Sequence, residues 1–211
     1  MYWLPIGSWE PHGPHLPYDT DTQIATQLAH LAAAPTDVVL PPLPFGTSWE
    51  HRGTGQPISL RVATAAQVVA DLAINIPDPL VIVNAHGGNA WLSAMVQELN
   101  GTGHPALLLP NSREWTRAYQ AAGWPFGPHE DMHAGALETS LLWIWAPDCI
   151  QWPLPPDHAA SDRPLFHGAG LAPYGPQGYI GFPQAASREA GQRAIAAVVA
   201  DIQKGIRIWQ P

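Results

Sequence analysis

The sequence has few of the residues that would mark several protein classes. It contains one cysteine, Cys149, so no internal disulfide can form, which fits a reducing cytoplasm. It contains one lysine, Lys204, and its arginines are scattered, so it lacks the clustered positive charge that nucleic-acid binding requires. No apolar run reaches about 18 residues, which predicts that the chain does not span a membrane. Residues 1–5 show no secretory signal, and we expect a cytoplasmic protein.

Charge of either sign is sparse, and the balance is acidic. Charged residues make up 12% of the 211 residues, and the formal net charge is -8. A cation or a small polar substrate suits this charge better than nucleic acid does. The chain also has 10 Trp and 24 Pro. With so few charges, we expect part of the aromatic surface to be buried between subunits, so a homo-oligomer is predicted.

Apolar runs alternate with helical patterns along the chain. The expected strands span residues 2–6, 38–40, 79–84 and 106–109. The expected helices span residues 22–34, 60–72, 90–99 and 187–202, and residues 137–144 form a helix or a strand. This order predicts an α/β layered fold with a mostly parallel central sheet. No linker divides the chain, so we expect residues 1–211 to form a single domain.

The loop after the first expected strand carries a dense set of metal-binding side chains. Glu10, His12 and Asp21 lie within a dozen residues, among prolines and glycines that fix the backbone. Two carboxylates and an imidazole suit zinc, manganese or iron(II), and an Asp can give one oxygen to each of two ions. The alternative is that the two carboxylates are solvated and that His12 is a turn residue.

A second candidate group follows the most apolar strand. His86 lies in the turn at residues 84–89, where a buried strand ends and a helix begins. Ligands bind at this edge of a parallel sheet, and Gly87 and Gly88 allow the backbone to approach a substrate closely. No lysine follows the glycines, so the turn is a poor phosphate loop. A helix-entry turn with an incidental histidine remains the alternative.

Two further groups lie on loops. Glu138 is expected in the first turn of a helix with His133 just before it, and this pair could bind a metal or transfer a proton. The alternative is that Glu138 caps the helix and His133 is exposed. Glu50 and His51 lie on the long polar loop after the second strand. They are candidate substrate contacts or a solvated loop pair.

These motifs together resemble the creatininase (creatinine amidohydrolase) family. Residues 10–17, followed by Asp21, are similar to its E-x-H-G-P-H-L-P…D motif. Residues 84–89 resemble its N-G-H-G-G-N turn, and residues 133–140 resemble its H-A-G-x-x-E-T-S motif. Residues 178–181 resemble its C-terminal signature, so the likeness covers nearly the whole chain.

The resemblance implies a three-layer α/β/α fold, a homo-hexamer and two divalent ions (zinc, manganese or iron). It assigns Glu10 and His86 to one ion and His12 to the other, with Asp21 shared by both. It gives His15 no ligand role, and we expect this residue to hold the loop. The implied reaction is hydrolysis of an amide C–N bond by a water held between the ions.

The creatinine-hydrolysing members take a further ligand from a Glu where this chain has Gly88. Creatinine is therefore a less favoured substrate, and Glu138 is the candidate for the missing ligand. Either His133 or Glu138 would move the proton to the leaving nitrogen. Members with a Gly-Gly turn include hydrolases of formamidopyrimidines and the mycofactocin precursor peptide peptidase. The expected substrate is therefore a cyclic amide, a formamide or a short peptide.

Two alternatives from other classes stay open. Ala136 stands where the family often has Glu, and Gln56-Pro57 replaces the usual G-T, so the substrate pocket differs from the family pattern. The Gln56-Pro57 change also supports the alternative of a non-catalytic metal-binding protein of the same fold. An α/β module that binds a sugar or nucleotide through the His86 turn would leave the residues of the opening loop unexplained. Metal content separates this last reading from the enzyme.

Overall fold

The computed structural model describes residues 1–209, and its elements follow the predicted alternation. The strands are β1 (Tyr2–Ile6), β2 (Val38–Val39), β3 (Leu80–Asn84) and β4 (Ala106–Leu109). The helices are α1 (Thr20–Ala32), α2 (Val62–Ala73), α3 (Leu92–Gly101), α4 (Ser112–Ala122), α5 (Ala136–Trp145), α6 (Phe166–Ala169) and α7 (Arg188–Ile208). Short 3-10 helices are η1 (Trp49–His51), η2 (Gly87–Asn89), η3 (Pro147–Cys149) and η4 (Pro183–Ala185).

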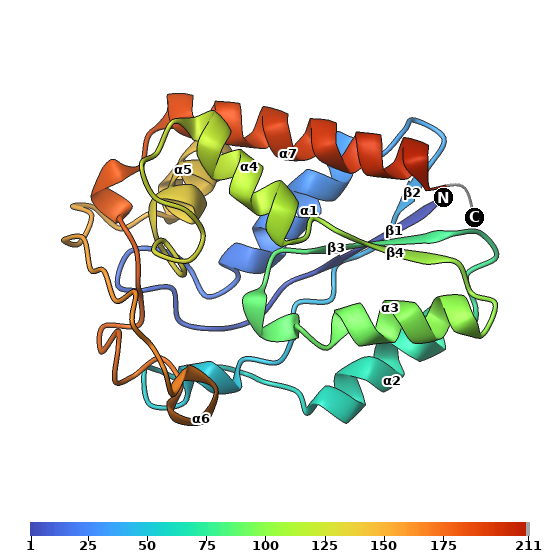
Figure 1. The fold of residues 1–211 in the computed structure, drawn as a ribbon, viewed down its shortest axis with the longest axis horizontal. Helices are drawn as coiled ribbons and strands as arrows, with labels where there is room; N and C mark the ends of the chain where they lie inside the picture. The colour runs from blue at the N-terminus through green and yellow to red at the C-terminus, as the bar shows by residue number, and fades with distance from the viewer. Residues whose placement is uncertain (210–211) are drawn as a thin grey trace.

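The four strands form one parallel sheet in the order β2-β1-β3-β4. In the register of the sheet, Tyr2 lies opposite Leu80, and Leu80 lies opposite Ala106. Helices α1, α4, α5 and α7 cover one face, and α2 and α3 cover the other (Figure 1). The predicted three-layer α/β/α fold with a parallel sheet is confirmed.

Strand β3 shows why the sheet is buried on both faces. Val81 and Val83 belong to the core under α1, α5 and α7, whereas Leu80 and Ile82 belong to the core under α2 and α3. All four side chains are at most 2% exposed. Successive side chains of a strand point to opposite faces, so an uninterrupted apolar run is what a central strand with two covered faces requires.

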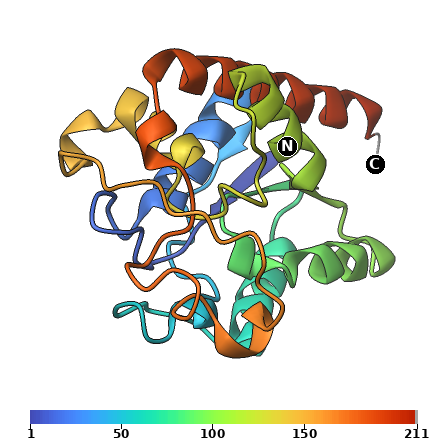
Figure 2. The same cartoon turned by 60° about the vertical axis from the view of Figure 1, so that its left-hand side comes forward.

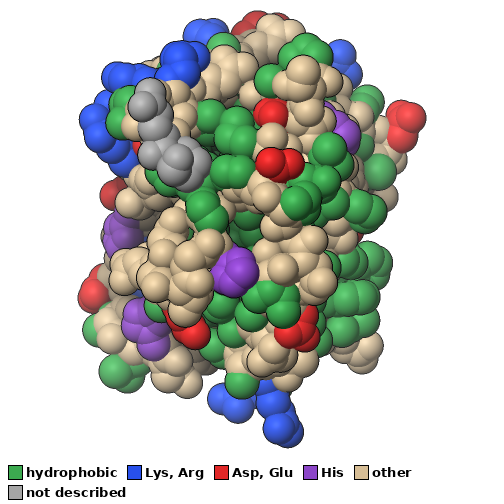
Figure 3. All heavy atoms as spheres, turned by 90° about the vertical axis from the view of Figure 1, so that its right-hand side faces the viewer, with side chains coloured by type: hydrophobic (Ala, Val, Ile, Leu, Met, Phe, Trp, Pro, Cys, Tyr) green, Lys and Arg blue, Asp and Glu red, His purple; other side chains and the backbone are tan. Residues whose placement is uncertain are grey.

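The two ends of the sheet differ in character. Beyond the carboxyl ends of the strands lie the long loops, and the chain from about residue 125 to 185 passes over them (Figure 2). On the face at the amino ends, Lys and Arg side chains lie at the periphery, most of them at the upper left, and hydrophobic side chains cover much of the middle and the right-hand side (Figure 3). Within residues 1–209, none of the helices combines the length and the apolar character needed to cross a bilayer.

Several expected bounds need correction. The first helix begins at Thr20 rather than at residue 22, and the last one continues to Ile208. The apolar spacing of residues 60–72 predicts a buried stripe of Val62, Ala66, Val69 and Leu72, but Ala65, Val69 and Ala73 are the buried residues of α2 and Val62 is 49% exposed. Residues 137–144, expected as a helix or a strand, lie within helix α5, which packs against α7 and α1.

Helix α4 was not predicted from the sequence, although a signal for it is present. Asn111 accepts a hydrogen bond from Arg113 N, and Glu114 accepts one from Asn111 N. This is a capping box, which marks a helix start by an Asn followed three residues later by a Glu. Gly123 ends the helix in the left-handed region at φ 84°.

Candidate metal centre

The loops after β1, β2 and β3 converge at the carboxyl edge of the sheet, as expected. The opening loop brings Glu10 and His12, and the start of α1 brings Asp21. The turn after β3 brings His86, and the segment before α5 brings His133. All five side chains are at most 7% exposed.

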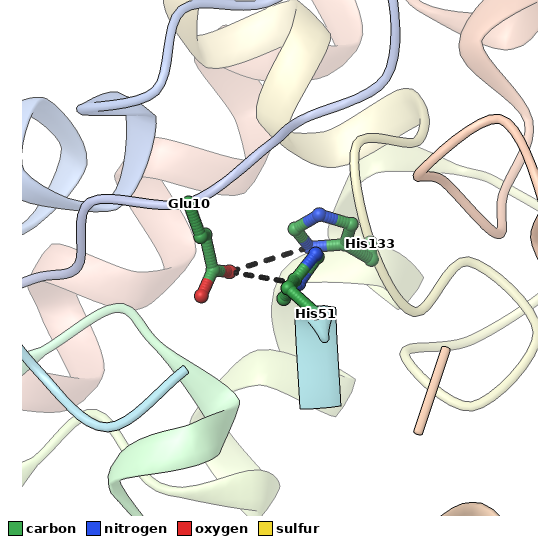
Figure 4. Close-up of side chains that lie close together, drawn as sticks. All are labelled: Glu10, His51 and His133. Atoms are coloured by element: carbon green, nitrogen blue, oxygen red, sulfur yellow. Dashed lines mark ion pairs between the residues drawn. The ribbon is translucent and has the colours of Figure 1, made fainter. Parts of the chain in front are cut away.

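Glu10 lies at the centre of the candidate site. Its Oε1 is 3.2 Å from His86 Nδ1, 3.4 Å from His51 Nε2 and 3.8 Å from His133 Nδ1. Figure 4 shows His51 and His133 pointing at this carboxylate from two different loops. Glu10 Oε2 is buried without a hydrogen-bond partner among the described residues. A buried carboxylate oxygen without a partner is costly, so it marks a place where a cation would stabilise the fold.

Asp21 connects two imidazoles. Its Oδ1 is 3.3 Å from His12 Nε2, and its Oδ2 is 3.1 Å from His86 Nδ1. Ser8 donates a hydrogen bond to Oδ2 over 2.6 Å, which fixes the carboxylate. The two oxygens therefore face two different histidines, which is the arrangement that a shared ligand requires.

Backbone carbonyls set the orientation of three imidazoles. His12 Nδ1 contacts Glu10 O at 3.0 Å, His86 Nε2 contacts Thr47 O at 3.0 Å, and His133 Nε2 contacts Pro11 O at 2.7 Å. A carbonyl oxygen only accepts, so each of these nitrogens carries the proton. In a neutral ring, the other nitrogen then directs a lone pair at the carboxylates, which is how metal-binding histidines are oriented.

The buried carboxylates of the cluster require positive charge beside them. Burial lowers the pKa of His12, but Asp21, joined by Glu138 and Glu10, outweighs it and raises the pKa to about 10. Burial also acts against the charged form of His86, yet Glu10 and Asp21 hold its pKa well above the usual value. Burial raises the pKa of Glu10, but His86 and His51 outweigh it and lower the pKa well below its usual range. Protons or a metal ion can supply this charge.

Glu138 lies in the first turn of α5, as expected. Its Oε2 accepts a hydrogen bond from Ala134 N over 2.7 Å and lies 3.9 Å from His12 Nε2. Burial is the main cause that raises the pKa of Glu138 to about 8, and Asp21 adds to it. His133 is buried, so the alternative of a solvent-exposed histidine is wrong. Burial and the charge of His12 lower the pKa of His133 well below its usual value.

Among residues 1–209, three groups of side chains could hold an ion, because their ligand atoms lie within 4.8 Å of one another. They are Glu10 with Asp21 and His86, His12 with His133 and Glu138, and Glu10 with His51 and His133. Carboxylate oxygens and imidazole nitrogens match the donor preference of zinc, manganese and iron. The donor set and the unpartnered Glu10 oxygen therefore fit divalent metal binding.

The loop at η1 contributes more than was expected. His51 is 2% exposed and faces Glu10, so it is a further candidate ligand that the sequence did not reveal, and it is not part of a solvated pair. Glu50 Oε1 lies 3.4 Å from His86 Nε2. Gly87 and Gly88 line the adjoining cavity, and a side chain at Gly88 would collide with Thr47 O. His15 Nε2 contacts Thr139 Oγ1 at 3.0 Å, which ties the opening loop to α5.

Comparison with known proteins identifies the family. Residues 1–206 match the family model described as Creatininase: Creatinine amidohydrolase. The chain belongs to the creatininase family. The resemblance seen in the sequence motifs is therefore confirmed, and with it the expectation of a hydrolase that acts on amide C–N bonds.

Relatives within the creatininase family include two peptidases. The chain is 33% identical over 231 residues to a mycofactocin precursor peptide peptidase of Mycolicibacterium smegmatis, covering 100% of this chain and 86% of the relative. It is 32% identical over 226 residues to the protein of the same name from Mycobacterium ulcerans, covering 99% of this chain and 85% of that one.

Solved structures of the creatininase family have the same fold. A creatinine amidohydrolase (creatininase) has a TM-score of 0.78 at 22% identity, covering 100% of this chain and 90% of the other. A structure described as "Creatininase Mn" has a TM-score of 0.77 at 22% identity, covering 99% of this chain and 90% of the other. A putative creatinine amidohydrolase from Bacteroides fragilis has a TM-score of 0.72 at 26% identity, covering 96% of this chain and 87% of the other.

Proposed function

We propose that this protein is a metal-dependent amidohydrolase that cleaves the amide bond of a short peptide. The observation that carries the proposal is Asp21, whose two oxygens face His12 and His86 in a buried cluster with Glu10. The relatives named mycofactocin precursor peptide peptidase support a peptide over a cyclic amide or formamide. Gly88, where creatinine-hydrolysing members have Glu, supports the same choice.

The proposed site holds two divalent ions, of zinc, manganese or iron. Glu10 and His86 bind one ion, His12 and Glu138 bind the other, and Asp21 is shared. The Nδ1 of His86 and the Nε2 of His12 are the ligand atoms, because both face the Asp21 carboxylate. Such ions would supply Lewis-acid polarisation of the substrate carbonyl and would activate a water.

Proton transfer is assigned to His133, with Glu138 as the alternative. His133 donates through Nε2 to Pro11 O, so Nδ1 is free to accept a proton inside the site. Bound to an ion, Glu138 would be ionised; in the metal-free site its pKa is raised to about 8, which makes it the alternative proton carrier in a centre where His12 and Asp21 hold the second ion without it. Glu50, His51, Gly87 and Gly88 line the cavity beside this centre, which supports their predicted role in substrate contact. His51 and His133 would alternatively serve as ligands with Glu10.

Metal analysis combined with an activity screen tests the proposal. We expect about two zinc, manganese or iron ions per chain and turnover of short peptides in preference to lactams and formamides. A protein that binds metal stoichiometrically but hydrolyses none of these amides would favour the non-catalytic alternative. A protein without bound metal at any pH would contradict the site assignment itself.

The cytoplasmic location, the single domain and the homo-oligomeric state stay predictions. The homo-oligomer is supported by exposed apolar side chains on the segment from η1 to α2, where Trp49, Ile58 and Val62 are each about half exposed. The hexamer implied by the family resemblance would bury such a surface. The mass of the protein in solution, measured by light scattering, tests this prediction.

A further inference from the structure

Two cavities of comparable size flank the candidate metal centre. Each has a volume of about 600 Å³. Five residues line both of them, so these residues form the boundary between the cavities: His86, Gly87, Ala90, Met132 and His133. A volume of this size accommodates a drug-sized group, and a compact lactam would fill only a fraction of one cavity.

The ligand cluster itself divides between the two cavities. Glu10 lines the first cavity only, whereas Asp21 and Glu138 line the second only. His86 and His133 face both. A bond positioned at the cluster would therefore have free space on both of its sides.

Gly87 lies on the boundary between the cavities, and open space adjoins it. A Cβ placed on this residue would meet no atom within 4 Å. Gly87 is also exposed, whereas its neighbour Gly88 is tightly packed against Thr47. The space beside Gly87 is therefore free of side chains at a residue that lines both cavities.

The first cavity is distinguished from the second by an arginine. It is formed by η1 and α6, which contact each other, and Arg52 lines it together with Glu10 and Glu50. Arg52 is exposed, and within the described chain it is the one Lys or Arg that lines either cavity. A guanidinium beside the open space favours a carboxylate, which it can bind in a bidentate manner.

The second cavity has apolar walls. The side chains of Ile24, Leu108, Trp115, Leu137 and Leu141 line it, and polar groups of Asn111 and Ser112 lie at α4. Cavities with this lining bind apolar and aromatic groups, with a few polar atoms that fix the orientation.

We infer that the two cavities bind the two halves of one extended peptide substrate across the metal centre. The carboxylate-bearing half occupies the first cavity at Arg52, and an aromatic or aliphatic half occupies the second cavity beside Trp115. This inference rests on the proposed function, because it identifies the peptide that the hydrolase would cleave.

Binding of separate half-substrates tests the inference without requiring turnover. The probes are the dipeptides acetyl-Phe-Gly and Gly-Asp, titrated by calorimetry into the metal-loaded protein. We expect both to bind together, with the Kd of each changed less than twofold by saturation with the other. Mutual displacement of the two probes would overturn the inference.

Two variants assign the probes to the cavities. Arg52→Gln should weaken Gly-Asp binding at least tenfold while the Kd of acetyl-Phe-Gly changes less than twofold. Ser93→Trp places a large side chain at the second cavity, which Ser93 lines, and should have the opposite effect. Arg61→Gln, an exposed arginine that lines neither cavity, is the matched control. Equal losses for both probes in either variant would overturn the assignment.

Hydrolysis of a joined substrate then separates this inference from the proposed function. We expect acetyl-Phe-Gly-Gly-Asp, or the reverse order acetyl-Asp-Gly-Gly-Phe, to show a kcat/KM at least tenfold above that of acetyl-Phe-Gly-methylamide. Independent binding of both halves without hydrolysis of any amide would support the two cavities and contradict the enzyme. Equal kcat/KM for the methylamide and the longer peptides would retain the enzyme and overturn the extended substrate.

Discussion

His86 directs its Nε2–H at the carbonyl oxygen of Thr47 over 3.0 Å. The opposite nitrogen, Nδ1, therefore faces Glu10 and Asp21 with its lone pair whenever the ring is neutral. This contact determines which atom of His86 can bind a metal. A backbone acceptor cannot be removed by mutation, so the orientation of the ring is best tested through the neighbouring carboxylate.

We expect Glu50→Gln to weaken metal binding about tenfold, because a carboxylate 3.4 Å from His86 Nε2 increases the basicity of the ligand. Competition with a fluorescent chelator measures the affinity. Glu98→Gln changes an exposed carboxylate on α3 and serves as the control. An unchanged affinity in the Glu50 variant would show that Thr47 alone orients the ring.

Asp21→Asn should remove at least one bound ion per chain and lower kcat/KM by at least a thousandfold. The substitution keeps the shape but takes away the negative charge that faces His12 and His86. Asp19→Asn is the matched control, because Asp19 lies just before α1 and contacts Gln23 instead. Elemental analysis of both variants gives the stoichiometry, and two ions retained by the Asp21 variant would refute its shared role.

The sequence predicted the sheet and the convergence of the loops because both depend on local patterns. The run from Leu80 to Val83 is apolar without a break, and only a central strand with two covered faces accepts that pattern. Glu10, His12 and Asp21 follow a strand directly, so the topology alone brings them to the edge of the sheet.

The sequence predicted a metal-binding or proton-transfer role for His133 and a substrate contact for His51, but not that both lie buried beside Glu10, because distant contacts place them. The backbone of Glu50 is held by Leu171 N over 2.7 Å, and that of His133 is paired with Ile180. These partners come from the irregular segment between α5 and α7, whose path has no periodic signal. Long-range tertiary contacts, rather than the local sequence, therefore bury both histidines beside Glu10.

Asp131→Asn should lower the free energy of unfolding by about 3 kcal/mol. The buried carboxylate accepts hydrogen bonds from Ala136 N, Leu137 N, Phe182 N and Tyr119 Oη. An amide group would turn its own N–H atoms toward some of these donors. Urea unfolding measures the change, and Asp78→Asn, at an exposed position, is the control. A loss below about 0.5 kcal/mol would show that the carboxylate network does not stabilise the start of α5.

Metal binding to this site must compete with protons. Near neutral pH and without metal, His12 is protonated, because Asp21, Glu138 and Glu10 together outweigh burial and raise its pKa to about 10. The pKa of His86 is also held well above its usual value, although burial opposes the charge. Both nitrogens that face the carboxylates must lose their protons before they can bind an ion.

We therefore expect metal binding at pH 7 to release at least one proton per chain. Because the metal-free protein carries more protons than the metal-bound protein, the affinity should rise with pH, by about tenfold per pH unit for each proton released. Calorimetric titration of zinc in buffers of different ionisation enthalpy counts these protons. His12→Gln should release fewer of them, whereas His30→Gln, on the exposed side of α1, should match the wild type. Binding without proton release would mean that the histidines are neutral before the metal arrives, and that something other than Asp21 and Glu10 controls their charge.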